Sequence, residues 1–337
     1  MKSPRELQQA LEKQMLSPQA SLSVSSVGRD RPEPECEIRT CYQRDIDRII
    51  HSKAFRRLKH KTQVFLRPEG DHYRTRLTHT LEVARIGRTV ARALRLNEDL
   101  VEAIAFAHDI GHTPFGHAGE NVLSKILAED GGFKHNEQSL RIAEVVELSG
   151  DGLNLTHEVR NGILCHTGSC KADTLEGDVV RVADRIAYIN HYIDDAVRAG
   201  ILSEDEIPAE IHCAIGSKHS ERINTLILDL ITESKKTGIV SLSPNIAFIF
   251  DTFRDYMYKH VYLNLEAKSE EAKVTGIIEG IFNYYLDYPE EMPEDYRKIA
   301  EKDGLKRAVS DYVSGMTDKY AIHIYEKLFI PDAWQVR

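Results

Sequence analysis

The chain has 337 residues, of which 42% are hydrophobic and 29% are charged, so it can bury a sizeable core in one large domain or two small ones. Its formal net charge of −9 argues against a surface that binds nucleic-acid phosphates over its whole area. Neither an apolar run of 18 residues nor the apolar segment of a secretory signal is present, so we expect a soluble, cytoplasmic protein.

The chain contains five cysteines, a small and odd number for its length: Cys36, Cys41, Cys165, Cys170 and Cys213. This usage is typical of reduced thiols and not of a disulfide framework. The Cys165 and Cys170 pair has no second Cys/His pair at zinc-finger spacing, so we expect no structural zinc there.

Residues 1–35 are rich in Ser and Pro and carry few apolar residues at a regular spacing. This composition predicts a mobile arm, or an arm that becomes ordered against another surface. We expect residues 36–337 to form a single domain, with its core at about 41–200 and additional helices at 201–337.

From Cys41 onward the apolar residues recur at helical spacing, and short Gly/Pro/Asp-rich turns separate the segments. An apolar helix over Leu100–Ala107 ends near Gly111. Only Val64–Leu66 and Ile239–Leu242 have the character of strands. The sequence therefore predicts an all-α fold, a compact bundle whose later helices span Asn136–Leu148, Thr156–Leu164, Gly177–Arg198, Glu221–Ser234, Asn245–Leu263, Glu270–Leu286 and Pro293–Phe329.

Positive charge is concentrated in one part of the chain. Between Lys53 and Arg95 there are 12 Lys and Arg residues against three acidic residues, a local charge of +9. A solvated basic helix face would explain this pattern, and so would a positive wall around an anionic ligand.

The strongest local signal is the pair His108-Asp109, at the end of the apolar helix. Burying such a pair is costly unless it is partnered or binds a metal ion. A core histidine beside a carboxylate is the commoner case for an isolated pair. His79 and Asp184 also lie in apolar helical surroundings, so three helices could each supply a ligand to one ion inside a bundle.

The set of His79, His108, Asp109 and Asp184 offers two imidazoles and two carboxylates, without a thiolate. Such donors suit Mn, Fe, Co, Ni or Mg more than structural zinc. Four protein ligands on an octahedral ion leave two positions for water and substrate, as metal-assisted hydrolysis requires.

The order H…HD…D resembles that of the HD-domain phosphohydrolases. Two longer strings, RRLKHKTQVF at 56–65 and HDIGHTPFGHAGE at 108–120, resemble one branch of them, the deoxyguanosinetriphosphate triphosphohydrolase (dGTPase-like) family. The resemblance runs from about Ser17 to beyond Tyr262, whereas the last quarter of the chain carries no motif that we can assign. It implies cleavage of a dNTP at the α-phosphate, which gives a deoxynucleoside and inorganic triphosphate.

The same resemblance implies four catalytic residues. His117 would lie beside the α-phosphate with Glu120 as its partner, three residues further along one helix face. His135 would contact the phosphates, and Arg76, one turn before His79, would reach a phosphoryl oxygen. The alternatives are a surface His–Glu pair and an exposed loop histidine.

Six residues match family contacts to the substrate: Gln63, His112, Arg185, Tyr188, Arg254 and Tyr262. The last two lie in a segment that could also be an amphipathic core helix. Eight residues after Asp184 the family usually has an aspartate that contacts the sugar 3′-hydroxyl, and here the residue is Tyr192. This departure puts the sugar and base preference in doubt.

Three functions compete. The first is a dNTP triphosphohydrolase that requires one divalent ion, for example manganese. The second is an HD-type phosphohydrolase acting on a nucleoside monophosphate, a nucleotide diester or an alarmone. The third is a nucleotide- or nucleic-acid-sensing protein with little turnover, and the basic segment keeps a nucleotide effector or single-stranded DNA open as partners. The resemblance also predicts a homo-oligomer, a dimer, tetramer or hexamer.

Overall fold

The computed structural model describes residues 2–63, 74–262 and 265–331. Over these residues the chain forms helices and turns, with two isolated β-bridges and no strand, so the predicted all-α class is confirmed. The α-helices of the first half are α1 (Pro4–Met15), α2 (Cys41–His51), α3 (Lys53–Arg57), α4 (Arg76–Leu94), α5 (Glu98–Ala107), α6 (Gly116–Ile126), α7 (His135–Arg141), α8 (His157–Cys165) and α9 (Leu175–Arg198). Those of the second half are α10 (Ala209–Ile215), α11 (His219–Thr237), α12 (Pro244–Met257), α13 (Leu265–Asp287), α14 (Glu294–Asp303), α15 (Leu305–Ser314) and α16 (Asp318–Phe329).

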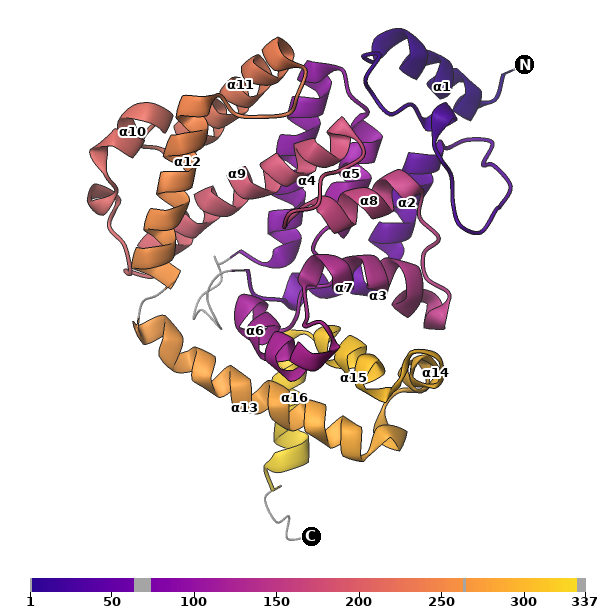
Figure 1. Ribbon diagram of the computed structural model, residues 1–337, viewed down its shortest axis with the longest axis vertical. Coiled ribbons are helices and arrows are strands. Elements are labelled where there is room, and N and C mark those ends of the chain that lie inside the picture. Colours follow the sequence, from indigo (N-terminus) through magenta and orange to yellow (C-terminus); the bar gives the residue numbers. More distant parts are fainter. Residues whose placement is uncertain (1, 64–73, 263–264, 332–337) are drawn as a thin grey trace, which may run out of the picture.

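Helices α4, α5 and α9 form the centre of the larger of two hydrophobic cores (Figure 1). Seven of the ten residues of α5 are apolar and buried, and α2, α4, α8 and α9 pack around this helix. A Cβ atom added to Gly87 would lie only 2.8 Å from the side chain of Val101, so this glycine sets the close approach of α4 to α5. The three central helices thus bring residues about 100 positions apart into one packed layer.

The turn between α5 and α6 depends on glycine. A Cβ atom on Gly111 would lie 2.1 Å from the backbone nitrogen of Ser139, so only glycine lets α7 pack against this turn. Phe115 has a φ of 64°, a conformation that costs a non-glycine residue about 1–3 kcal/mol. The surrounding contacts must therefore hold this turn in place.

A second hydrophobic core lies between α6 and the C-terminal helices α13–α16. Helix α13 crosses one end of the molecule beside α6, with α15 and α16 nearby (Figure 1). The carboxylate of buried Asp318, at the start of α16, accepts hydrogen bonds from the backbone nitrogens of Phe115 and Thr62, both at 2.9 Å. The Lys61 ammonium donates to the carbonyls of His112 and Ser314, the latter at 2.8 Å. The C-terminal region, which carries no assigned motif, therefore supports the turn that follows His108-Asp109.

Two sequence expectations about regular structure are wrong. The span Pro293–Phe329 is three helices and not one, because Gly304 at φ 90° interrupts it and Thr317 begins a new helix with a side-chain cap. Ile239–Leu242 forms no strand; it is the connection between α11 and α12, and within the described part of the chain it has no bridge partner. The other strand-like segment, Val64–Leu66, lies outside the described residues.

The N-terminal segment is helical at its start and packs along the central helices. The backbone nitrogen of Ser21 donates to Glu176 of α9 at 3.0 Å, and that of Val27 donates to Glu158 of α8 at 2.7 Å. Arg29 forms a buried ion pair with Asp45 of α2. Of the two alternatives, a mobile arm or an ordered one, these contacts agree with an arm ordered against the body of the same chain. The domain boundary at residue 35 stays a prediction.

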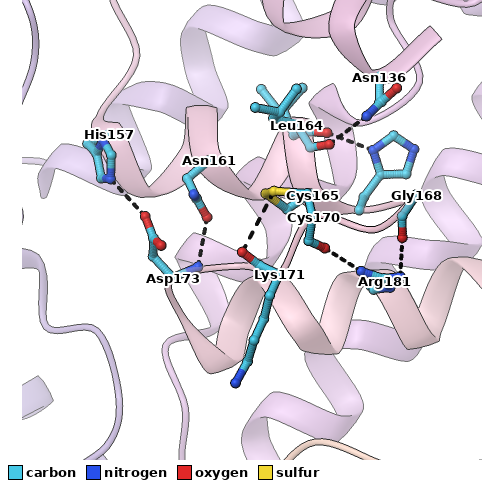
Figure 2. The surroundings of a disulfide bond; sticks show 12 residues. Asn136, His157, Asn161, Leu164, Cys165, Gly168, Cys170, Lys171, Asp173 and Arg181 are labelled. Atoms are coloured by element: carbon cyan, nitrogen blue, oxygen red, sulfur yellow. Dashed lines mark hydrogen bonds and ion pairs between the residues drawn. A yellow bond between two sulfur atoms is a disulfide. The ribbon is translucent and has the colours of Figure 1, made fainter. Parts of the chain in front are cut away.

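Cys165 and Cys170 form a disulfide in the structure (Figure 2), so the expectation that all five cysteines are reduced is wrong for this pair. The disulfide closes the loop between α8 and α9. Arg181 of α9 donates to the carbonyls of Gly168 and Cys170 in the same loop. Among the described residues, no helix is both long and apolar enough to cross a bilayer.

Asp318→Ala should lower the free energy of unfolding by about 2–5 kcal/mol, because it leaves the backbone nitrogens of Thr62 and Phe115 buried without their acceptor. Denaturant unfolding measures this change. Lys319→Ala, at the exposed neighbouring position, is the matched control and should change stability by less than about 0.5 kcal/mol. Equal stabilities of the two variants would contradict the assigned role of Asp318.

Candidate active site

Four predicted metal ligands meet at the centre of the larger core. His79 lies on α4, His108 and Asp109 directly follow α5, and Asp184 lies on α9. The Oδ1 atom of Asp184 is 3.0 Å from His79 Nε2 and 3.7 Å from His108 Nε2. The Oδ2 atom of Asp109 is 3.6 Å from His108 Nε2 and 3.9 Å from His79 Nε2. The structure thus brings together the four residues that the sequence grouped.

These residues fit a divalent cation. The Nε2 atom of His108 is buried and makes no hydrogen bond within the described part of the chain. Burial alone would lower the pKa of His108, but Asp109 and Asp184 raise it to about 9. Burial likewise opposes ionisation of Asp184, whose pKa is nevertheless lowered by His108 and His79. The cluster therefore stabilises a positive charge between its donor atoms, which is what a metal ion supplies.

Outer hydrogen bonds orient both imidazoles. His108 Nδ1 donates to the carbonyl of Ala105 at 2.6 Å, which leaves Nε2 as the ligand atom. His79 Nδ1 lies 3.3 Å from His191 Nδ1, and His191 Nε2 is hydrogen-bonded to Glu82. Because the Glu82 carboxylate accepts the proton on Nε2, His191 can accept from His79, whose own Nε2 then faces the ion.

The sequence analysis missed His191 and Glu82. A signal was present, because Glu82 is one helical turn after His79 and His191 is seven residues after Asp184, so each shares a helix face with a ligand. Burial alone would raise the pKa of Glu82, but His191 and Arg74 lower it, so the carboxylate is ionised.

A cleft of about 170 Å³ opens beside the metal ligands. Three residues on its wall were not among the predicted site residues: Thr167, Ile189 and Phe250. Eleven of the predicted site residues line it: Gln63, Arg76, His79, Asp109, His112, His117, His135, Asp184, Arg185, Tyr188 and Arg254. His108 and Glu120 are not part of this lining, but they contact residues that are, Asp109 and His135 respectively. The side chain of the remaining predicted residue, Tyr262, lies outside the described part of the structure.

Arg76 is the most notable cation of the cleft. It is 1% exposed, and its Nη1 atom donates to Asp109 Oδ2 at 2.8 Å. Its Nε and Nη2 atoms are buried and have no acceptor among the described residues. A buried guanidinium with unused donors, in a cleft wall beside a metal set, matches a phosphoryl oxygen as its partner.

Three further histidines gather next to Arg76. The rings of His112 and His135 stack with centroids 4.1 Å apart, and His117 lies edge-on to His112 at 5.6 Å. Burial lowers the pKa of His117 to about 4, and Arg76 acts in the same direction, so His117 is neutral at pH 7. A neutral imidazole can accept a proton from a reacting group.

Glu120 contacts His135. Its Oε1 atom accepts hydrogen bonds from the backbone nitrogen of His135 at 2.9 Å and from His135 Nδ1 at 3.0 Å. These contacts involve Glu120 and His135 only. The pairing of Glu120 with His117 therefore stays a prediction.

His166, at the end of α8, is a buried histidine that the sequence analysis did not single out. Its Nδ1 atom donates to the carbonyl of Ile163 at 2.7 Å, and its Nε2 atom is 3.3 Å from His135 Nε2. Burial, together with His108 and His135, lowers the pKa of His166 to about 3. The available signal was its place at the end of the apolar run Gly162–Cys165.

The outer part of the cleft carries two arginines that share one carboxylate. Arg185 and Arg254 contact Asp251 at 2.7 and 3.1 Å, and Arg185 also lies over the ring of Phe250. Tyr188 stacks on Tyr192, the residue that departs from the family pattern, at a centroid distance of 5.3 Å.

The carboxylates after Tyr192 have other partners. Asp194 and Asp195 lie 3.1 and 3.5 Å from the Arg74 guanidinium, and Asp194 also contacts His219. They therefore do not take the place of the missing aspartate.

Comparison with known proteins agrees with this geometry. A family model described as HD domain matches residues 76–189, and one described as phosphohydrolase-associated domain matches residues 240–327. A relative from Caldanaerobacter subterraneus subsp. tengcongensis is 54% identical over 330 residues, covering 98% of this chain and 97% of its own. Another from Clostridium perfringens strain 13 is 50% identical, with 97% and 98% covered. Both relatives are named deoxyguanosinetriphosphate triphosphohydrolase-like protein.

Glu82→Ala should weaken Mn²⁺ binding by about 10–100-fold, because His191 loses the acceptor that fixes its tautomer and so the orientation of His79. Isothermal titration calorimetry measures the Kd. Glu129→Ala, on an exposed turn, is the control and should bind as the unaltered protein does. An unchanged Kd in Glu82→Ala would show that this relay does not support the metal ligand.

Proposed function

Given that the chain belongs to the deoxyguanosinetriphosphate triphosphohydrolase-like family of HD-domain proteins, we propose that it hydrolyses dNTPs, including dGTP, at the α-phosphate. The chain is a metal-dependent phosphohydrolase. One observation carries the proposed substrate class: Arg76 is buried against the ligand Asp109 and keeps two donors unpaired by any described residue in the cleft wall. An anionic phosphoryl group is the partner that this arrangement lacks.

His79, His108, Asp109 and Asp184 would hold the ion, and their nitrogen and oxygen donors suit a first-row divalent metal such as manganese, or magnesium. When bound, the ion would polarise a phosphoryl oxygen and lower the pKa of a water molecule. Asp184→Ala should accordingly lose both metal and activity.

The chain's own residues position the substrate and move a proton. Arg76 would bind the α-phosphoryl oxygens, and neutral His117 would accept a proton from the attacking water. The water oxygen then bonds to Pα, the bond between Pα and the 5′ oxygen breaks, and the proton that His117 accepted passes to that oxygen, so the deoxynucleoside leaves as a neutral alcohol. The products are a deoxynucleoside and inorganic triphosphate.

The remaining cleft residues would bind the rest of the nucleotide. Arg185 and Arg254 would contact the β- and γ-phosphates, and both already pair with carboxylates of the outer cleft, Asp251 for each of them and Asp255 for Arg254. His112, His135 and Tyr188 also border this space. Buried Gln63 would contact the sugar 3′-hydroxyl, and Tyr192, behind Tyr188, would shape the pocket for the sugar.

Hydrolysis of a dNTP panel in ¹⁸O-labelled water tests the proposal. We expect the label in the α-derived phosphoryl group of released triphosphate, with an unlabelled deoxynucleoside. Label in γ-derived orthophosphate, with the nucleoside left as diphosphate, would overturn it. Turnover restricted to monophosphates, diesters or an alarmone would assign another HD-type phosphohydrolase, and binding without turnover would identify a sensor.

His117→Ala should lower kcat by about 10²–10⁴-fold while the protein retains its metal, the usual scale for a lost acid–base group. Glu120→Gln should give a smaller loss, because Glu120 orients a histidine and does not contact the substrate. His157→Ala, an exposed position on α8, is the control. Metal loss in His117→Ala would show that His117 supports the ion instead.

We also propose that the chain self-associates. Helix α1 leaves three apolar side chains exposed at four-residue spacing, Leu7, Leu11 and Met15, which is a stripe that a second copy could cover. Light scattering should show a dimer or larger assembly, and Leu11→Glu should reduce its mass; a monomer at micromolar concentration would contradict the proposal.

A further inference from the structure

The disulfide between Cys165 and Cys170 closes a short loop that borders the cleft (Figure 2). Thr167, inside this loop, lines the cleft wall beside the predicted metal ligands. His166 is buried, and its Nε2 atom lies 3.3 Å from Nε2 of His135, another residue of the wall. Two consecutive residues of the loop therefore contact the site, so the conformation of the loop sets part of the shape of the cleft.

The loop is also tied to the helix that carries one of the predicted metal ligands. Arg181 of α9 donates hydrogen bonds to the carbonyls of Gly168 and Cys170 (Figure 2). On the same helix Arg181 lies three residues before Asp184, close to one helical turn. These bonds hold the second half of the loop, and the disulfide holds its two ends together.

A thiol in solution can reach this disulfide. Cys165 is buried at the end of α8, but Cys170 is only partly buried, and Gly168 and Ser169 between them are exposed. Because thiol attack depends on access to the sulfur, Cys170 is the sulfur that an external thiol meets. The other cysteines are free thiols, namely Cys36, Cys41 and Cys213. One disulfide among free thiols is more typical of a redox-sensing pair than of a disulfide framework.

We propose that Cys165 and Cys170 form a reversible thiol–disulfide modification site that controls the affinity of the cleft for its substrate. A dithiol is the reductant. Its first thiolate bonds to the Cys170 sulfur, the bond between the two protein sulfurs breaks, and Cys165 leaves as a thiolate that takes up a proton. The second thiol of the reductant then displaces the Cys170 thiolate, which is protonated, and the reductant becomes a disulfide. Two electrons and two protons thus pass from the dithiol to the protein.

Reduction acts on the cleft through the loop. With the link broken, the loop can adopt other conformations, because Gly168 is exposed and its φ of 73° belongs to a region that glycine leaves and enters easily. Thr167 must then be ordered again when the substrate binds, and ordering one residue lowers affinity by about 2–10-fold. KM should therefore rise more than kcat falls, since the predicted metal ligands and Arg76 lie outside the loop. The effect on substrate rests on the proposed function, whereas the exchange of thiols does not.

A permanent structural disulfide is the alternative, and the short loop argues against it. In the chain-entropy model, the stability that a disulfide gives the fold grows with the length of the loop that it closes. The two cysteines are only five positions apart, so the gain in global stability is small. The same link fixes a residue of the cleft wall, so its effect falls mainly on the site.

Peptide mapping and kinetics on the full-length protein test the proposal. One sample is treated with dithiothreitol and one with glutathione disulfide, and both are desalted. After alkylation in denaturant, mass spectrometry should find Cys165 and Cys170 alkylated in the first sample and linked in the second. KM for dGTP should be about 2–10-fold higher in the reduced protein and should return after re-oxidation. Trypsin should cleave after Lys171, an exposed residue next to Cys170, faster in the reduced protein.

Two variants separate this pair from other effects of the reagents. Cys170→Ser cannot form the link and should have the KM of the reduced protein after either treatment, which also excludes binding of the reductant to the metal as the cause. Cys213→Ser, an exposed cysteine on α10, is the matched control and should respond as the unaltered protein does. If Cys170→Ser fails to fold, as circular dichroism would show, Cys170→Ala serves in its place.

A link that glutathione disulfide does not form, or that dithiothreitol does not break, would overturn the proposal. Equal KM values in the two forms would overturn it as well. Failure here is distinct from failure of the proposed function. Turnover of dNTPs with equal KM values rejects only the redox site, whereas redox-dependent cleavage after Lys171 without dNTP turnover rejects only the substrate.

Discussion

The structure depends on one electrostatic constraint, namely that imidazoles and carboxylates converge in a space from which water is largely excluded. Two carboxylates, Asp109 and Asp184, lie within 3.9 Å of two imidazole nitrogens in the interior of the larger core. Such a group is stable only if a cation balances it or if protons take the place of the cation. The pKa of His108 is raised for the same reason. Burial alone would lower it, but the neighbouring carboxylates stabilise the protonated ring.

The helical scaffold meets this constraint through rigidity. The four predicted ligands come from three segments, so the distances between His79, the His108-Asp109 pair and Asp184 are set by how α4, α5 and α9 pack. Gly87 allows α4 to approach α5 and α9 closely, and Gly111 allows α7 to pack against the turn after α5. Close-packed helices move little relative to one another, so the donor atoms stay near the positions that a ligand requires.

Charged side chains of both signs line the cleft. The predicted metal set carries two carboxylates, and Arg76 contacts one of them, Asp109. Arg185 and Arg254 lie at the outer part of the cleft, paired with Asp251 and Asp255. The centre is therefore suited to a cation, and the cation-bearing wall beside it to an anion. The C-terminal helices contribute from behind, because Asp318 of α16 fixes the turn between the metal ligands and α6. That region supports the site, and none of its described residues lines the cleft.

The sequence by itself determined the helical class and grouped the four predicted metal ligands, because helical periodicity and an ionisable pair in an apolar run are local patterns. It also grouped most of the cleft residues through motif resemblance. Only the tertiary structure decided the partners: His191 with His79, Glu120 with His135, and His166 across from His135. These contacts join residues up to 112 positions apart. They depend on the angle and distance at which helices cross, which many side chains set together and no short segment of sequence specifies.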